Sequence, residues 1–208
     1  DIAGGGIITE LVHDEQEGLR EEARQREYAW LTGDVRAEDR ATQYGHRAAI
    51  VLFTGSAQTG KTFLARRVEA LLVADSRHAY LLEGENLLQG LDADLSAADP
   101  SFAAERVRRY GEVARLLIDT GLIVVSTSKT FGINYQRMAE MIRTLVQPAP
   151  VIAVHMSRAG EEPPPNTDLH FAGPQDFDAA ARQILEELKR RGVLIQPSGT
   201  KSTIQYSI

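Results

Sequence analysis

The feature that most constrains this chain is an eight-residue loop between an apolar strand and a helix. The loop runs from Gly55 to Thr62, reads GSAQTGKT and fits the phosphate-loop pattern G-x-x-x-x-G-K-[ST]. The apolar run from Ile50 to Phe53 precedes it, and apolar residues recur after Lys61 at helical spacing. Because the strand and the helix both stand where the pattern requires them, we interpret the loop as phosphate-binding rather than as a chance match.

The backbone of such a loop accounts for its chemistry. Small residues at its turns let successive N–H groups and the helix N-terminus converge on phosphate oxygens. Lys61 would reach the β and γ phosphates of a nucleotide, and the Thr62 hydroxyl would bind Mg²⁺. We therefore predict that a nucleotide binds through Gly55, Ser56, Ala57, Gln58, Thr59, Gly60, Lys61 and Thr62.

Composition excludes several classes of function. With 208 residues and 43% apolar content, the chain is long enough for one sizeable core. Its net charge of −6 argues against broad binding to nucleic acid, although a local basic pocket for a small anion stays compatible with it. Cysteine is absent, which excludes disulfides, thiolate zinc sites and cysteine nucleophiles. A cytoplasmic location is consistent with the absence of cysteine and is our expectation. With no apolar run near about 20 residues, we predict no membrane contact.

Strands and helices alternate along the chain. Helices are predicted over 101–120, 133–146 and 176–191, and apolar strands over 50–53, 79–82, 122–125 and 151–154. Right-handed crossovers between such strands give a parallel sheet with helices on both faces. We therefore predict an α/β fold of the three-layer, P-loop NTPase type. The tail from Val193 is predicted either to add an edge strand or to hang free.

Polar residues follow two of these strands where parallel strands face a ligand. Glu83 and Glu85 flank a glycine after the second strand, so they could hold Mg²⁺ through water or take the proton of an attacking hydroxyl. A solvated turn is the alternative. Lys129, after the next strand, is well placed for an anion, although turn residues look the same. His155 and His170 are predicted to be packed rather than to act as ligands.

The domain boundaries follow from composition. The charged, glycine-rich residues 1–33 are predicted to be an arm, 34–195 the globular domain and 196–208 a tail. The chain begins with Asp1 rather than methionine, so we expect it to be a fragment of a longer protein. The proline-rich loop over 158–168 has no catalytic spacing of its own.

Several segments resemble the adenylylsulfate kinases. YGHRAAIVLFTG, residues 44–55, looks like the segment that leads into their phosphate loop, and EGEN, residues 83–86, stands where they have D-G-D-N. RRYGEVA, residues 108–114, is similar to their I-R-R-x-G-E-V-A helix, and GLIVV, residues 121–125, to the strand after it. The resemblance implies transfer of the γ-phosphate of ATP, with Mg²⁺, to the 3′-hydroxyl of adenylylsulfate.

The start of the chain adds a second resemblance. Residues 1–11 resemble the closing strand of the last β-barrel in the GTPase subunit of sulfate adenylyltransferase, behind which bacterial adenylylsulfate kinases are often fused. This implies a C-terminal kinase-like domain of such a subunit, with the sulfate adenylyltransferase small subunit as a partner through the full-length chain. A homodimer is a further expectation.

Departures from the family pattern fall mainly in the substrate site. Leu88 and Gln89 replace an arginine and a histidine, Pro100 stands where another arginine is expected, and the lid sequence is missing between Ser157 and Asp168. The residues that match ATP binding survive, whereas those that match substrate binding mostly do not. We therefore expect ATP to bind and phosphorylation of adenylylsulfate to be weak or absent. The alternative is a degenerate nucleotide-binding module kept for regulation or assembly.

The resemblance also implies roles for individual residues. Lys61 with Glu83 or Glu85 would be catalytic, and Thr62 and Glu83 would hold the metal. Asn86 is a candidate contact to the substrate, and Arg106, Arg109 and Lys129 are the candidates to replace the lost anion contacts.

Overall fold

The computed structural model describes residues 30–31, 33–127, 135–173 and 176–195. All helices and strands described below belong to one unit, Thr32–Ile208. The predicted tail 196–208, nearly all of the predicted arm 1–33 and Lys129 lie outside the described residues, so those assignments stay predictions.

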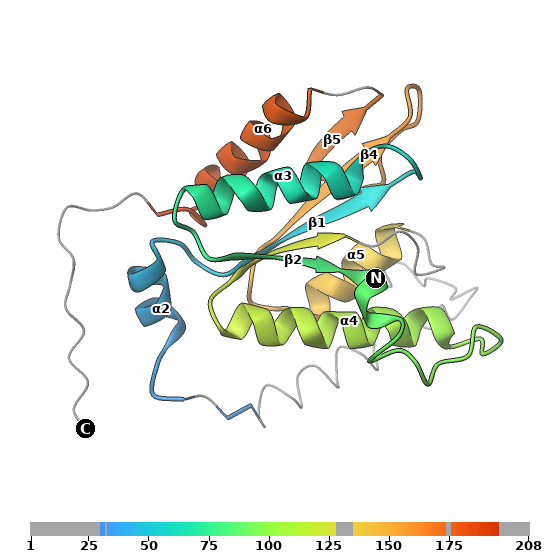
Figure 1. The fold of residues 1–208 in the computed structure, drawn as a ribbon, viewed down its shortest axis with the longest axis horizontal. Helices are drawn as coiled ribbons and strands as arrows, with labels where there is room; N and C mark the ends of the chain where they lie inside the picture. Colours follow the sequence, from blue (N-terminus) through green and yellow to red (C-terminus); the bar gives the residue numbers. More distant parts are fainter. Residues whose placement is uncertain (1–29, 32, 128–134, 174–175, 196–208) are drawn as a thin grey trace, which may run out of the picture. The chain divides into compact units, whose positions relative to one another are not determined.

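Five strands and five α-helices, with one short 3-10 helix, make up the described part of this unit (Figure 1). The strands are β1 (Ala49–Gly55), β2 (Ala79–Glu83), β3 (Ile123–Thr127), β4 (Val151–Ser157) and β5 (Leu169–Ala172). The helices are α2 (Ala37–Tyr44), α3 (Lys61–Ala74), η1 (Gly84–Leu87), α4 (Phe102–Asp119), α5 (Tyr135–Leu145) and α6 (Phe177–Arg190).

The strands form one parallel sheet in the order β2-β3-β1-β4-β5, which confirms the predicted fold class. Every residue of β1, β3 and β4 is buried, as expected of central strands covered on both faces. Strand β5 was not predicted, because only Phe171 of its four residues is buried and no apolar run marks it. Beyond α6, Leu194 makes only an isolated antiparallel bridge to His46.

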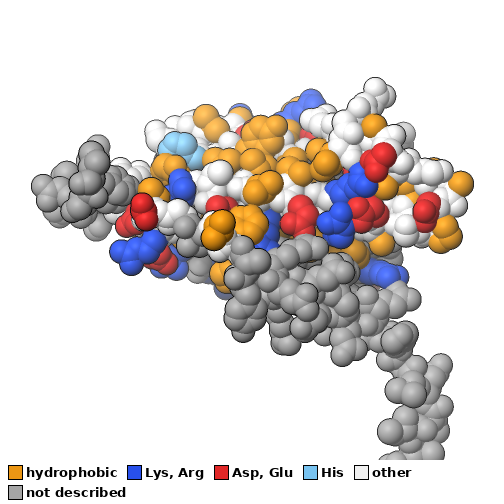
Figure 2. All heavy atoms as spheres, turned by 90° about the horizontal axis from the view of Figure 1, so that it is seen from below, with side chains coloured by type: hydrophobic (Ala, Val, Ile, Leu, Met, Phe, Trp, Pro, Cys, Tyr) orange, Lys and Arg blue, Asp and Glu red, His pale blue; other side chains and the backbone are white. Residues whose placement is uncertain are grey.

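Helices cover both faces of the sheet. Helices α3 and α6 pack together on one face, and α4 and α5 on the other (Figure 1). Leu64 and Leu72 of α3 meet Ile184 and Leu188 of α6 in the core, and all four side chains are fully buried. The surface around α4, seen from below in Figure 2, mixes acidic, basic and apolar side chains. None of the described helices is long and apolar enough to cross a membrane.

Candidate active site

The phosphate loop is held by close backbone approach at both of its glycine ends. Gly55 has φ +122°, and a Cβ there would lie 1.9 Å from the carbonyl oxygen of Met156 on β4. That oxygen also accepts a hydrogen bond from the N–H of Ser56 (3.0 Å). Gly60 has φ +87°, and a Cβ there would lie 2.6 Å from the ring of Phe177. Only glycine fits these positions, so the sequence pattern has a direct steric cause.

Lys61 begins α3 and points back over the loop. Its ammonium donates hydrogen bonds to the carbonyl oxygens of Gly55 (3.0 Å) and Ser56, and the residue is 8% exposed. Burial lowers the pKa of this lysine. The Thr59 hydroxyl closes the loop by donating to the Ser56 carbonyl (2.9 Å). A cation is thus held inside the turn, where a phosphate group would receive its hydrogen bonds.

The predicted carboxylate Glu83 lies at the carboxyl end of β2, on the same side of the sheet's strand ends as the phosphate loop. Its register partner on β3 is Thr127, which in turn pairs with Phe53 of β1, two residues before Gly55. With neighbouring strands about 4.8 Å apart, the Glu83 backbone lies roughly 10 Å from β1. The Thr127 hydroxyl donates to Oε2 of Glu83 (2.6 Å). Oε1 is buried and accepts no hydrogen bond from any residue that the structure describes, so one carboxylate oxygen stays available to a ligand.

A buried tyrosine on α4 contacts the carboxyl ends of β2 and β3. The sequence could not reveal these contacts. The hydroxyl of Tyr110 donates to the carbonyl oxygen of Leu82 (2.8 Å) and hydrogen-bonds the hydroxyl of Ser126. Complete burial raises the pKa of Tyr110 well above its usual range. The ring thereby fixes the ends of β2 and β3, which carry Glu83 and Thr127. An apolar periodicity predicts that Tyr110 points inward, but it cannot name the partners of its hydroxyl.

Comparisons with known proteins decide the family. The sequence profile of the family described as "Adenylylsulphate kinase" matches residues 47–163, more than half of the chain. The chain belongs to the adenylylsulfate kinase family. An adenylyl-sulfate kinase of Yersinia pestis is 29% identical over 194 residues, covering 79% of this chain and 89% of the relative. One of Shewanella amazonensis is 38% identical over 128 residues, covering 62% of this chain and 63% of the relative.

Solved structures give the same answer. A cysteine-to-alanine variant of the Mycobacterium tuberculosis APS kinase CysC superposes with a TM-score of 0.60 at 29% identity, covering 69% of this chain and 99% of that one. The same kinase in complex with AMPPNP and APS gives a TM-score of 0.58 at 24% identity, over the same shares of the two chains. At that lower identity the second comparison supports the fold alone.

The two arginines predicted to contact the substrate are ion-paired with carboxylates. Nε of Arg106 lies 3.4 Å from Oδ2 of Asp92, and both side chains are buried. Nη2 of Arg109 lies 2.9 Å from Oδ2 of Asp94, and this contact lowers the pKa of Asp94 to about 2. A role in adenylylsulfate kinase chemistry would require each arginine to exchange its partner, so their role as substrate contacts stays a prediction. Asn86 lies exposed in η1.

The two histidines differ from each other. His155 is buried, as predicted, and its Nδ1 lies 2.9 Å from the hydroxyl of Thr54. Burial is the main reason that its pKa is lowered, with the nearby His170 and Lys61 adding to the effect. His170 was also predicted to be packed, but it is exposed because β5 is an edge strand; its Nε2 lies 2.8 Å from the Ser157 hydroxyl.

Sequence reasoning missed one residue at the phosphate loop, Glu161. It lies in the proline-rich connection between β4 and β5, where no spacing marked it. Its Oε2 accepts hydrogen bonds from the Ser56 hydroxyl (2.5 Å) and the backbone N–H of Arg158 (3.0 Å). The bond from Ser56 lowers the pKa of Glu161, so the carboxylate stays ionised at neutral pH. A negative charge thus lies against the loop that is to receive phosphates.

We expect Glu161→Gln to raise the affinity for Mg-ATP about fivefold, because the carboxylate repels phosphate from an exposed position where water screens most of the interaction. Calorimetry at low and high salt measures the effect, which should shrink as salt screens the charge. Glu162→Gln, an exposed neighbour, is the control. Weaker binding by the Glu161 variant would instead assign the carboxylate a positioning role for Ser56.

Proposed function

We propose that the chain binds Mg-ATP at its phosphate loop as an adenylylsulfate kinase-type phosphotransferase, and that its activity toward adenylylsulfate is weak or lost. One observation carries this proposal: the phosphate-loop sequence 55–62 is intact, whereas Leu88, 39% exposed, stands at the position of a substrate arginine. Family membership supports the reaction class, and the replaced side chains support the loss.

The residues on the ATP side suit their proposed roles. Lys61 would turn its ammonium from the loop carbonyls to the β and γ phosphates. Glu83 has one buried carboxylate oxygen without a partner among the described residues, which suits either a metal-bound water or the proton of the acceptor hydroxyl. Glu85 is the alternative base. Mg²⁺, held by Thr62 and Glu83, would neutralise charge on the transferred phosphate.

The acceptor side explains why we expect low turnover. Each lost charge-assisted contact to a sulfate or phosphate removes about 1.5 to 3 kcal/mol. Arg106 and Arg109 already bind carboxylates and are not simple substitutes. The connection over 158–168 contains no helix or strand, so it offers little cover to exclude water from two anionic ligands.

A second function is favoured by the same departures. A kinase domain that keeps its nucleotide loop but loses its acceptor contacts could serve as a nucleotide-binding regulatory or structural domain of a sulfate adenylyltransferase subunit. The small subunit of that enzyme would then be its partner. In this case ATP binding persists while adenylylsulfate-dependent turnover is absent.

An ADP-release assay with adenylylsulfate, run beside the Yersinia pestis relative, tests both functions. We expect ATP to bind and turnover to lie at least about 100-fold below that of the control, as two lost contacts predict. Leu88→Arg should raise turnover if the acceptor site is otherwise intact. Turnover near the control, abolished by Glu83→Gln, would contradict the loss of activity. Absence of ATP binding would contradict both functions.

A further inference from the structure

A cavity of about 730 Å³ lies at the opposite ends of the strands from the phosphate loop. Its walls include Arg47 and Ala48 at the start of β1, Ala149 and Pro150 before β4, and Ile118 near the end of α4. The cavity lies at the amino ends of the parallel strands β1 and β4, whereas the phosphate loop follows the carboxyl end of β1. The volume is typical of a site for a small organic molecule.

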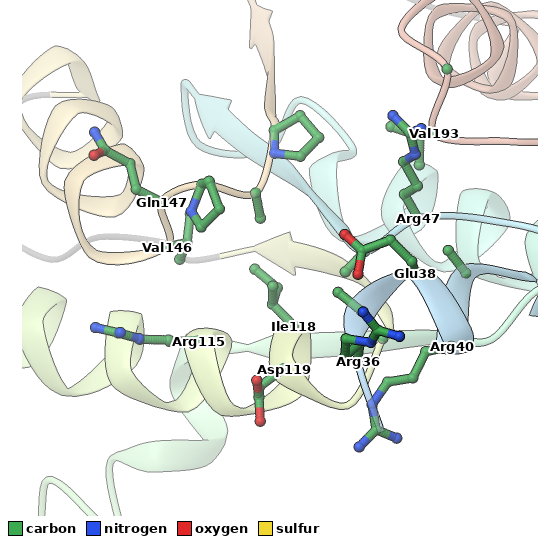
Figure 3. Close-up of a pocket in the computed structure, with 18 of the residues that line it drawn as sticks. Arg36, Glu38, Arg40, Arg47, Arg115, Ile118, Asp119, Val146, Gln147 and Val193 are labelled. Carbon is green, nitrogen blue, oxygen red and sulfur yellow. The ribbon is translucent and has the colours of Figure 1, made fainter. Parts of the chain in front are cut away.

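Arginines dominate the charge of this cavity, which we call the arginine cavity. Two carboxylates, Glu38 and Asp119, also line it. Figure 3 shows that the lining side chains come from α2, from the start of β1 and from α4, segments far apart in the sequence. The five arginines are Arg36, Arg40, Arg47, Arg115 and Arg191.

This local excess of positive charge runs against a chain whose net charge is −6. Two of the five arginines are ion-paired with carboxylates outside the cavity lining: Arg191 with Asp168 and Glu187, and Arg36 with Asp39 (3.8 Å). Arg40 and Arg47, by contrast, have no carboxylate within ion-pair distance among the residues that the structure describes. Guanidinium groups repel one another when separate backbone segments bring them around one cavity. A bound anion would attract each of them and so offset that repulsion.

The other walls narrow the ligand class. Val35, Ile118, Val146 and Pro148 supply apolar surface, which suits a ligand with an apolar body. The carboxylates of Glu38 and Asp119 can accept hydrogen bonds from hydroxyl or amino groups. A concave site on an acidic protein favours a small molecule over an extended polyanion such as nucleic acid.

We propose that the arginine cavity binds a small organic molecule that carries at least two phosphate or sulfate charges, such as a nucleoside diphosphate. This site is separate from the phosphate loop and does not depend on the function proposed for that loop. Arg40 and Arg47 supply the principal contacts, since neither must give up a carboxylate of the described part of the chain to bind the ligand.

The test titrates pyrophosphate and ADP into ¹⁵N-labelled full chain that carries Lys61→Ala, which weakens binding at the loop. We expect saturable shifts of the Ala37, Ala41 and Gly192 amides, with an affinity that falls as salt rises. In the same background, Arg40→Gln with Arg47→Gln should weaken this binding about tenfold or more. Arg182→Gln, an exposed arginine on α6, is the matched control and should change it less than twofold.

Three results would overturn the proposal: no shifts at millimolar ligand, shifts confined to residues 55–62, or cavity shifts that the arginine pair leaves unchanged. A cavity that responds to an acidic peptide but not to pyrophosphate or ADP would also overturn it, and would assign this face to a protein partner. Amide spectra of the variants away from the cavity establish that they remain folded.

Discussion

Lys61→Ala is expected to lower the affinity for Mg-ATP about 100-fold, because a buried ammonium that hydrogen-bonds phosphate contributes about 1.5 to 3 kcal/mol. The lysine is 8% exposed and already lies inside the loop, so binding exchanges carbonyl partners for phosphate oxygens without first bringing the side chain in from solvent. Loss of a preorganised cation should also slow any phosphoryl transfer by a factor of about 100 to 1,000.

Calorimetry with Mg-ATP measures the effect of Lys61→Ala on binding. Lys189→Ala on α6 is the control, since that lysine is half exposed and, among the residues that the structure describes, pairs with Glu186 on the same helix. Thermal unfolding of both variants separates loss of binding from loss of structure. Unchanged ATP affinity in the Lys61 variant would mean that the loop is not the nucleotide site.

Asp92→Ala is expected to cost about 3 to 5 kcal/mol of the free energy of unfolding, because it leaves the charge of Arg106 buried without this carboxylate. The exposed fractions of the two side chains are 1% and 7%, and Nε lies 3.4 Å from Oδ2. The guanidinium of Arg106 also lies over the ring of Phe102, with Cζ 5.4 Å from the ring centroid. Removing both charges with Asp92→Ala and Arg106→Met should recover part of the loss.

Asp94→Ala supplies a matched control for this pair. Asp94 also binds an arginine, Arg109, but its side chain is 66% exposed, so its loss should cost much less stability than the loss of Asp92. Urea denaturation of the three variants measures the differences. A cost for Asp92→Ala as small as that for Asp94→Ala would show that water reaches Arg106, and would support the predicted role of that arginine as a substrate contact.

The sequence by itself determined strands β1 to β4 and the position of the phosphate loop between β1 and α3. Central strands are buried on both faces, so their apolar runs are continuous, and Ile50 to Phe53 could be placed in β1 from pattern alone. The phosphate loop is equally local: its glycines, Lys61 and Thr62 lie within eight residues. Parallel strands end at one edge, which placed Glu83 near the loop without any knowledge of its partners.

Tertiary structure decided everything that depends on distant residues. Strand β5 forms by pairing with β4, and its four residues carry too little apolar pattern to reveal it. Glu161 reaches Ser56 across 105 residues of chain, and Asp92 meets Arg106 beneath the surface. The arginine cavity joins five separate segments of the chain. Local periodicity reports which way a side chain faces, whereas the identity of its partner depends on how the crossovers bring segments together, and that is fixed only when the core packs.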